Sequence, residues 1–290
     1  RNLANQSPRR IYWAHNRVLI IGEDLAREGI EDIIDVLLRE NQVRGSLHIL
    51  IARGSAEDIL NATFELERIP SQALEGITEV VTDMKSTSIM SILIQMAREM
   101  GTEGMEAVTA AVEPVLRPQP QSPQQGILEE KVIGTSVRVF GLGVFKDFRL
   151  VGLLNERESR GWLWVRGEIK SGTLMVKHPL DEDKLVSLRL LGGESEITPL
   201  MVDGRPVIRV RIEAEANLEE TQKETNLIGD HTLWHSLERQ MAAAIRNEVR
   251  SALAAAQGEY QSDIFGFGRS IYARYPREWI KMRDNWDDIF

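Results

Sequence analysis

Cysteine is absent from this sequence of 290 residues, and its absence removes several kinds of chemistry at once. Without thiols the chain can form no disulfide, no thiolate metal site and no cysteine nucleophile. Thiol content therefore carries no information about the compartment in which the protein works.

Long hydrophobic runs and basic runs are also missing. The longest apolar stretches cover residues 18–21 and 47–52, with His48 inside the second. Both fall far short of the roughly 20 residues that cross a bilayer as a helix. The net charge is −9, and Lys and Arg are not clustered. This pattern argues against nucleic acid or an anionic membrane surface as a direct partner, since phosphate binding requires clustered cations.

A leader segment is not visible either. The sequence begins at Arg1 instead of Met, and its opening RNLANQSPRR has no apolar core of the kind found in secretory signals. These features predict a piece of a longer protein. The remaining composition, 42% hydrophobic and 27% charged, is that of a folded chain with room for two or three domains.

The first part of the chain alternates between strand and helix patterns. A buried strand is predicted over residues 17–22 and another over 47–53, with a helix from Glu23 onward between them. Further helices are predicted over 71–83 and 86–100, followed by a strand over 105–115. Residues 117–126, RPQPQSPQQG, have the composition of a solvated linker, and we predict a domain boundary there.

The second part of the chain is richer in strands. A hairpin is predicted from strands 137–145 and 149–154, turned at residues 146–148. Further strands are predicted over 173–178, 184–191 and 207–216, the last with strict alternation of apolar and polar residues. From His231 an apolar stripe at helical spacing predicts a helix of about 27 residues, packed on an antiparallel sheet. Its members are Trp234, Leu237, Met241, Ile245, Val249 and Leu253.

The fold class predicted from these elements is α+β, with mixed sheets, packed helices and a C-terminal antiparallel sheet carrying one long helix. The predicted division is a remainder of an N-terminal α/β domain over 1–116, the linker, a small hairpin-plus-helix domain over 127–171 and a C-terminal domain over 172–290. A single C-terminal unit after the linker is the alternative.

Motifs that would indicate chemistry are weak. Gly141-Leu142-Gly143 lacks the third glycine and the following helix of a phosphate-binding loop. His231 and His235 have the spacing of a zinc pair but lack the intervening Glu that would activate a water. No nucleophile motif accompanies the histidines. The sequence therefore predicts no catalytic residue, no cofactor site and no metal site.

The most charged local cluster is NERESRG at residues 155–161, next to two tryptophans. Asn155 and Glu158 have the spacing of a helix N-cap and its reciprocal partner, which predicts a helix over 156–166 closed by Gly167. On this helix Glu156 and Arg160 are predicted to form an ion pair one turn apart. A catalytic interpretation would need a desolvated Glu156 or Glu158, whereas capping and pairing explain the same residues without chemistry.

Five ordered segments together resemble one known family. They are HNRVLIIGEDLAREGI (15–30), ILIARGSAEDIL (49–60), VFKDFRLVGLLNERESRGWLW (144–164), IEAEANLEE (212–220) and SDIFGFGRSIYARYPREWIKMRDNWDDIF (262–290). The chain resembles the C subunit of the spore germinant receptor, the Ger(x)C lipoprotein family of spore-forming bacteria, over nearly its whole length. Members of that family are described as three mixed α/β domains.

The resemblance implies a non-enzymatic receptor subunit in spore germination that assembles with A and B subunits. It also implies an N-terminal lipid, such as palmitate, that holds the protein on the outer face of the spore inner membrane. The family's signal peptide, lipid-bearing cysteine and opening strands are missing from this sequence.

Two groups of residues are candidate partner contacts under this resemblance. The first is Asn155, Glu156, Arg157, Glu158 and Arg160, and the second is Phe265, Phe267, Tyr275 and Trp279. For the aromatic group the alternative is a C-terminal tail packed on its own sheet. For the whole chain the alternative function is binding of a small ligand in a cleft between domains.

Overall fold

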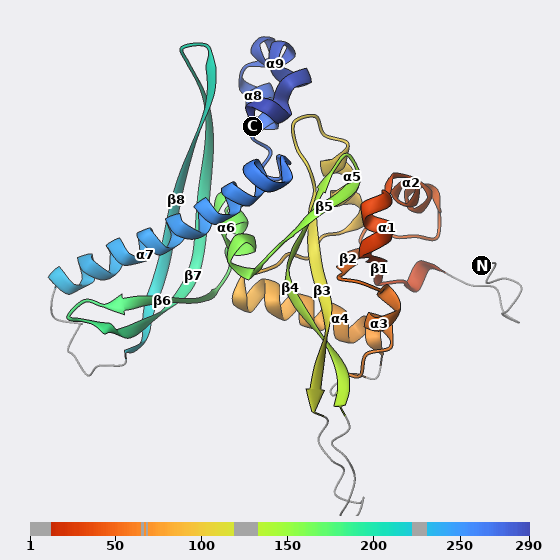
Figure 1. Ribbon diagram of the computed structural model, residues 1–290, viewed down its shortest axis with the longest axis horizontal. Helices are drawn as coiled ribbons and strands as arrows, with labels where there is room; N and C mark the ends of the chain where they lie inside the picture. Colours follow the sequence, from red (N-terminus) through yellow and green to blue (C-terminus); the bar gives the residue numbers. More distant parts are fainter. Residues whose placement is uncertain (1–12, 65–66, 68, 119–132, 222–230) are drawn as a thin grey trace, which may run out of the picture.

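The computed structural model of the protein describes residues 13–64, 67, 69–118, 133–221 and 231–290. Its architecture is α+β, as predicted, with two separate sheets and helices packed on both (Figure 1). The five-stranded sheet has the order β1-β2-β3-β4-β5, parallel from β1 to β3 and antiparallel from β3 to β5. Its strands are β1 (Val18–Gly22), β2 (His48–Ala52), β3 (Val108–Pro118), β4 (Ile133–Lys146) and β5 (Arg149–Leu154).

Helices cover both faces of this first sheet. On β2, Ile49 and Ile51 face one cluster of helices, while Leu50 and Ala52 face the other, as the two-residue period of a strand requires. The first face packs on α1 (Glu23–Glu28), α2 (Glu31–Arg39) and α5 (Leu93–Met100). The second packs on α3 (Ala56–Leu60) and α4 (Pro70–Val80), which continues as a π-helical turn over Val81–Lys85.

The helix predicted to run from Glu23 is broken into α1 and α2. Gly29 has a φ of 132°, a conformation that favours glycine, and it ends α1. The next residue, Ile30, is fully buried and donates its backbone N–H to the carbonyl of Phe148 at 3.0 Å. A tertiary contact therefore ends the helix, and the apolar spacing alone could not reveal it.

The helix predicted over 86–100 is helical only in its second half, as α5. Ser86 is left-handed, with φ 46°, and the residues from there to Ser91 form no helix. Ser88 and Ser91 are buried, and their hydroxyls donate to backbone carbonyls of β4 and β3 at 3.3 and 2.9 Å. Serine hydroxyls that bind the backbone elsewhere favour non-helical conformations, which explains the shorter helix.

The predicted linker joins two neighbouring strands of one sheet. β3 and β4 pair antiparallel from Val108 opposite Val144 to Pro118 opposite Ile133. Residues 117 and 118 belong to β3, and residues 119–126 of the predicted linker lie outside the described residues. The domain division predicted at 117–126 therefore cuts through a single five-stranded sheet, a pairing that composition could not reveal.

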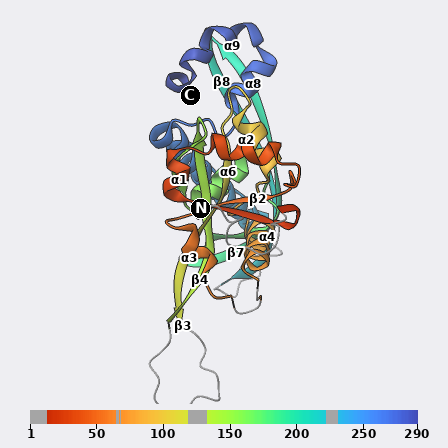
Figure 2. The same cartoon turned by 90° about the vertical axis from the view of Figure 1, so that its right-hand side faces the viewer.

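The second sheet is a three-stranded antiparallel ribbon of unusual length. Its strands are β6 (Gly172–His178), β7 (Asp181–Val202) and β8 (Arg205–Thr221), in the order β6-β7-β8. The predicted strands over 173–178, 184–191 and 207–216 are confirmed, but β7 and β8 extend well beyond them. β7 and β8 pair down to Val202 opposite Arg205, so the tip of this hairpin reaches toward the C-terminal helices (Figures 1 and 2).

The long helix α7 (His231–Leu253) lies across this ribbon and ends in a π-helical turn over Ala254–Tyr260. All six residues of its predicted stripe belong to the core shared with the second sheet and with α6 (Glu156–Arg166), so the predicted packing is confirmed. The C-terminal elements α8 (Phe267–Arg274), α9 (Pro276–Met282), a 3-10 turn over Arg283–Asn285 and α10 (Trp286–Ile289) follow. They lie at one end of the molecule, and the end of β3 and the start of β4 lie at the other (Figure 2).

Candidate partner-contact site

Helix α6 begins within the charged cluster at residues 155–161. Asn155 Oδ1 accepts hydrogen bonds from the backbone N–H groups of Arg157 at 2.9 Å and Glu158 at 3.0 Å. Glu158 Oε2 in turn accepts from the N–H of Asn155 at 3.0 Å, and Gly167 ends the helix with φ 68°. The predicted capping box and helix bounds are confirmed. Asn155 and Glu158 are thus occupied in holding the first turn.

Glu156 and Arg157 have no such internal role. Both side chains are exposed in the first turn of α6. Within the described ranges, neither side chain has a hydrogen-bond or ion-pair partner. They are therefore the two members of the first candidate group that stay open to another molecule.

Arg160 does not pair with Glu156, so that prediction is wrong. Its guanidinium reaches Glu248 of α7, with Nε 2.9 Å from Oε2 and Nη2 bonded to Oε1. Trp164 Nε1 donates to the same carboxylate at 2.9 Å. Glu248 is only 6% exposed, so its carboxylate has lost most of its hydration and needs a cation to stabilise its charge. Glu156 is exposed, and water stabilises its charge instead.

The backbones of α6 and α7 are in direct contact beside this ion pair. A Cβ on Gly161 would lie 2.1 Å from the carbonyl oxygen of Glu248 and 2.9 Å from Cβ of Ala252. Glycine is therefore required for the crossing. Trp162, the next residue, donates its Nε1–H to the carbonyl of Ile264 at 2.8 Å. α6 is thus fixed both to α7 and to the segment that leads into the C-terminal helices.

The aromatic candidate group lies mostly inside the protein. Phe265, Phe267 and Trp279 are 1%, 5% and 2% exposed, and Tyr275 is half-buried. Phe265 and Phe267 stack with ring centroids 5.1 Å apart, and Trp279 meets Trp286 edge-on at 5.2 Å. These positions correspond to the alternative interpretation, in which the C-terminal segment packs within its own chain.

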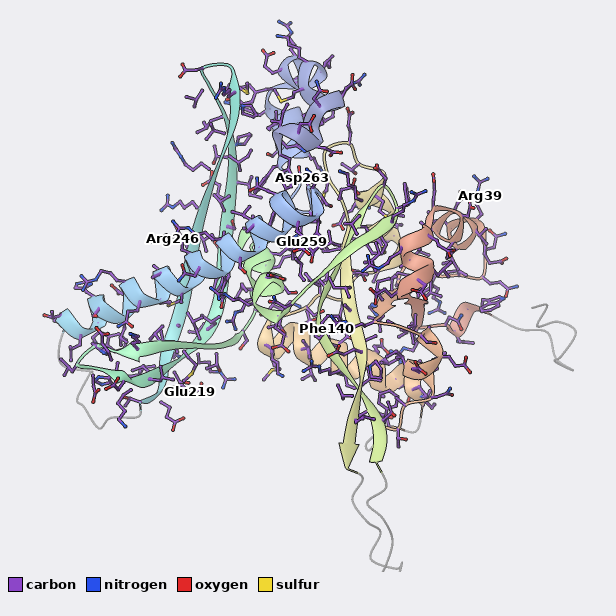
Figure 3. All side chains as sticks on the ribbon, in the orientation of Figure 1. Arg39, Phe140, Glu219, Arg246, Glu259 and Asp263 are labelled. Atoms are coloured by element: carbon purple, nitrogen blue, oxygen red, sulfur yellow. The ribbon has the colours of Figure 1, made fainter. Side chains whose placement is uncertain are left out.

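Asp263, which is labelled in Figure 3, accepts four hydrogen bonds from this C-terminal segment. One carboxylate oxygen accepts from the N–H groups of Gly266 at 2.9 Å and Phe267 at 3.0 Å. The other accepts from the N–H of Gly268 at 2.7 Å and from Trp286 Nε1 at 3.0 Å. Burial raises the pKa of Asp263 to about 6, and these four N–H donors limit the rise.

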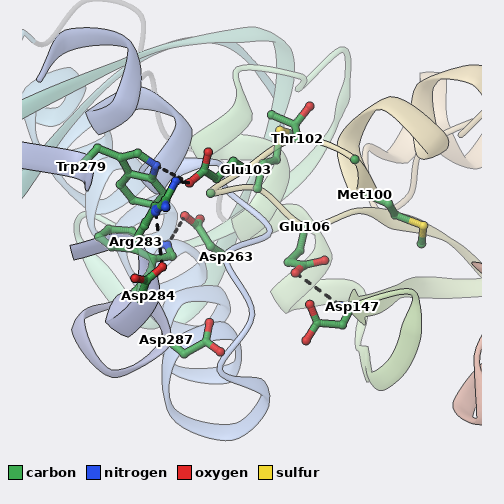
Figure 4. A pocket seen from close by; sticks show the side chains of 14 residues that line it. Met100, Thr102, Glu103, Glu106, Asp147, Asp263, Trp279, Arg283, Asp284 and Asp287 are labelled. Carbon is green, nitrogen blue, oxygen red and sulfur yellow. Dashed lines mark hydrogen bonds and ion pairs between the residues drawn. The ribbon is translucent and has the colours of Figure 1, made fainter. Parts of the chain in front are cut away.

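A pocket of about 540 Å³ opens between the C-terminal helices and the loop that follows α5 (Figure 4). Its polar lining is mainly acidic and is crossed by internal bonds. Glu103 accepts from Trp279 Nε1 at 3.0 Å and lies 3.7 Å from Arg283. Asp287 pairs with Lys146 at 2.7 Å. These bonds tie the C-terminal helices to the first sheet and its loops.

Glu106 is the second acid of this pocket with a strongly shifted pKa. Desolvation raises the pKa of Glu106 to about 7, and the backbone N–H of Asp147, at 3.4 Å, opposes the rise. In the unfolded chain the same carboxyl ionises near 4.5. Ionised Glu106 therefore lowers the stability of the fold as the pH rises through about 7.

We expect the effect of Glu106→Gln on the free energy of unfolding to be more stabilising at pH 8 than at pH 5. The neutral amide removes the cost of the buried charge, so its effect on the free energy of unfolding should be more favourable at pH 8 by about 1 to 2 kcal/mol. Urea unfolding of both proteins at the two pH values measures this, with Glu57→Gln as an exposed control. An equal effect of Glu106→Gln at both pH values would contradict the assignment.

Among the described residues, no group of three or more His, Asp or Glu side chains is arranged to hold a metal ion. His235, one of the two histidines spaced like a zinc pair, has its Nδ1 2.9 Å from Glu238 Oε2. No helix in the described ranges is both long and apolar enough to cross a bilayer.

Sequence reasoning missed three structurally important acids. Glu248 falls on the apolar stripe of α7, three residues after Ile245, and a charged residue in such a stripe is a detectable signal for a buried ion pair. Asp263 precedes Gly266 and Gly268 at spacings that suit a side-chain cap. Glu106 gives no local signal, because its environment comes from distant segments.

Comparison with known proteins places the chain beside spore germination proteins. Residues 1–114 match the family described as spore germination protein N-terminal domain, and residues 140–290 match the family described as spore germination B3/GerAC like, C-terminal. Spore germination protein KC of Bacillus subtilis (strain 168) is 25% identical over 96% of this chain and 68% of its own length. Spore germination protein YndF of the same strain is 27% identical over 99% of this chain and 67% of its own length.

A solved structure shares the fold. The crystal structure of the GerBC protein superposes with a TM-score of 0.65 and 20% sequence identity, over 100% of this chain and 78% of that one.

Proposed function

Because this chain belongs to the GerAC-like spore germination family, the C-subunit type of germinant-receptor protein, we propose that it is a non-enzymatic scaffold within such a receptor. In this proposal it assembles with an integral A subunit and a transporter-like B subunit. An N-terminal lipid holds it on the outer face of the spore inner membrane. A single acyl chain anchors only marginally, so contacts with the other subunits would reinforce the attachment.

Polar side chains at the start of α6 divide into two groups, and this division supports the proposal. Asn155, Glu158 and Arg160 are used within the fold, by the capping box and by the Glu248 ion pair. Glu156 and Arg157 project from this fixed helix and bond to no side chain in the part of the chain that the structure describes. A rigid helix start that presents an acid and a base side by side is suited to docking against a complementary polar surface.

Exchanging the two charges tests this docking surface. We expect Glu156→Arg combined with Arg157→Glu to abolish assembly with the A and B subunits while leaving net charge unchanged and stability within about 0.5 kcal/mol of wild type. The full-length protein would be expressed in spores, and its co-purification with the two subunits and the germination response would be measured.

A matched control reverses charges elsewhere on the surface. Glu57 lies in the first turn of α3 and Arg44 in the loop before β2, and both are exposed. Glu57→Arg with Arg44→Glu should leave assembly intact. Normal assembly by the Glu156/Arg157 variant, with the protein folded and at wild-type abundance, would remove the start of α6 as the contact.

The pocket of about 540 Å³ beside Asp263 is the place where the alternative function, small-ligand binding, can be tested. Calorimetry of the isolated chain with amino acids, sugars and nucleosides separates the two functions. Binding that is weakened by Arg283→Ala would favour a ligand site in this pocket, and the absence of heat for all three classes would favour the scaffold.

A further inference from the structure

β8 forms one edge of the three-stranded sheet along its whole length. It is 17 residues long and pairs with β7 on one side. No strand among the described residues pairs with its other side. Such an edge presents a row of backbone N–H and C=O groups that can bind another strand.

The two faces of β8 differ in character. Even-numbered residues from 206 to 218 are half-buried on the side of α7, where Val210, Ile212 and Ala214 line a groove of about 440 Å³ beside Met241 and Ile245. Odd-numbered residues from 205 to 219 are exposed on the opposite face. A strand added to this edge would therefore extend an apolar layer on one face and meet charges on the other.

Charges on the exposed face follow a self-complementary order. Its first half carries Arg205, Arg209 and Arg211, and its second half carries Glu213, Glu215 and Glu219 (Glu219 is labelled in Figure 3). Consider two β8 strands paired antiparallel with Ile212 opposite Ile212. Residues that lie opposite each other are then equally far from Ile212 along the two strands, one before it and one after it. This register places Arg209 opposite Glu215 and Arg211 opposite Glu213, each twice by symmetry. Arg205 comes to the level of Glu219, which sits at a bulge of β8 and already pairs with Arg189 of β7 at 3.3 Å.

Neighbouring registers lack this match. A centre at Arg211 places that arginine opposite itself, and a centre at Glu213 places two glutamates opposite each other. Cross-strand pairs of opposite charge stabilise a sheet, and like charges destabilise it. The charge order thus selects one register and one partner, a second copy of the same strand.

Within the single chain these charges are incompletely matched. Arg205, Arg209 and Glu215 have no hydrogen bond or ion pair with any described residue. Glu213 lies opposite Glu194 on β7 and has Arg211 of its own strand at 2.7 Å as its counter-charge. Arg211 of a second copy would supply another cation at this like-charge position.

We propose that β8 pairs with β8 of a second copy of this chain, antiparallel and centred on Ile212, so that two three-stranded sheets join into one. This interface goes beyond the receptor function proposed above and stands or falls independently of it.

An engineered cysteine tests the register, because these 290 residues contain none. Ile212 would lie on the two-fold axis, where directly opposed Cβ atoms come within about 4.5 to 5.5 Å, a separation that a disulfide can bridge with modest adjustment. We expect Ile212→Cys to form a covalent dimer under mild oxidation. Val36→Cys, at an exposed position on α2, should stay monomeric under the same conditions.

Charge exchange tests the partner. In sedimentation experiments at high micromolar concentration the wild type should dimerise, and Arg209→Glu and Glu215→Arg should each raise the dimer dissociation constant by about tenfold or more. An equimolar mixture of the two variants should dimerise again, since each chain then supplies the charge that the other requires. The double variant should also dimerise.

The proposal is overturned if the wild type is monomeric, if both single variants dimerise as the wild type does, or if mixing them restores nothing.

Discussion

Replacing Arg160 with alanine is expected to lower the free energy of unfolding by about 3 to 5 kcal/mol. Arg160 supplies the cation for Glu248, whose side chain is 7% exposed between α6 and α7. Without it a carboxylate remains buried with Trp164 Nε1 as a single remaining side-chain donor among the described residues. Urea unfolding at pH 7, followed by circular dichroism, measures the loss.

Two variants make this result specific. Arg157→Ala removes an exposed arginine from the same helix and should cost no more than about 0.5 kcal/mol. Arg160→Leu combined with Glu248→Leu removes both charges and should recover a substantial part of the stability. A loss of about 1 kcal/mol or less in Arg160→Ala, the value of an exposed ion pair, would show that the pair is not buried in solution.

Asp263→Ala is expected to undock the C-terminal helices. The substitution leaves three backbone N–H groups and the indole of Trp286 without their acceptor. Removing a buried charge with a raised pKa offsets part of this cost, so we expect a net loss of about 2 to 4 kcal/mol.

Hydrogen exchange gives the more specific readout for Asp263→Ala. Amide protection should fall in α8, α9 and α10, while the strands of the first sheet keep theirs. Asp288→Ala, an exposed acid in α10, serves as control and should leave protection unchanged. Unaltered exchange across residues 267–290 in Asp263→Ala would contradict the role assigned to this carboxylate.

Local signals in the sequence were sufficient for elements whose stabilising contacts are local. The N-cap of α6, its bounds and its glycine stop all come from residues within one helix, and all are confirmed. The stripe of α7 is equally local, since one period decides which residues face the sheet. Both predictions rest on backbone geometry that a short segment determines by itself.

Distant contacts account for what could not be predicted. Arg160 has an acid one turn away in sequence, yet it binds Glu248, which is 88 positions later and lies in a less solvated place. The break at Gly29 depends on Phe148, and the non-helical segment after Ser86 depends on β3 and β4. In each case burial decided between two possible hydrogen-bonding partners, and burial is known only once the fold is complete.

The hairpin of β3 and β4 has a consequence for how the protein is made. The first three strands of the five-stranded sheet come from the part of the chain before residue 119, but β4 and β5 end only at residues 146 and 154. On the ribosome, a nascent chain that has reached residue 118 would expose the fully buried stretch of β3 as a bare edge. The chain must therefore emerge as far as residue 154 before this sheet can close. Translation that pauses within residues 119–132 would prolong the interval in which nascent chains can aggregate.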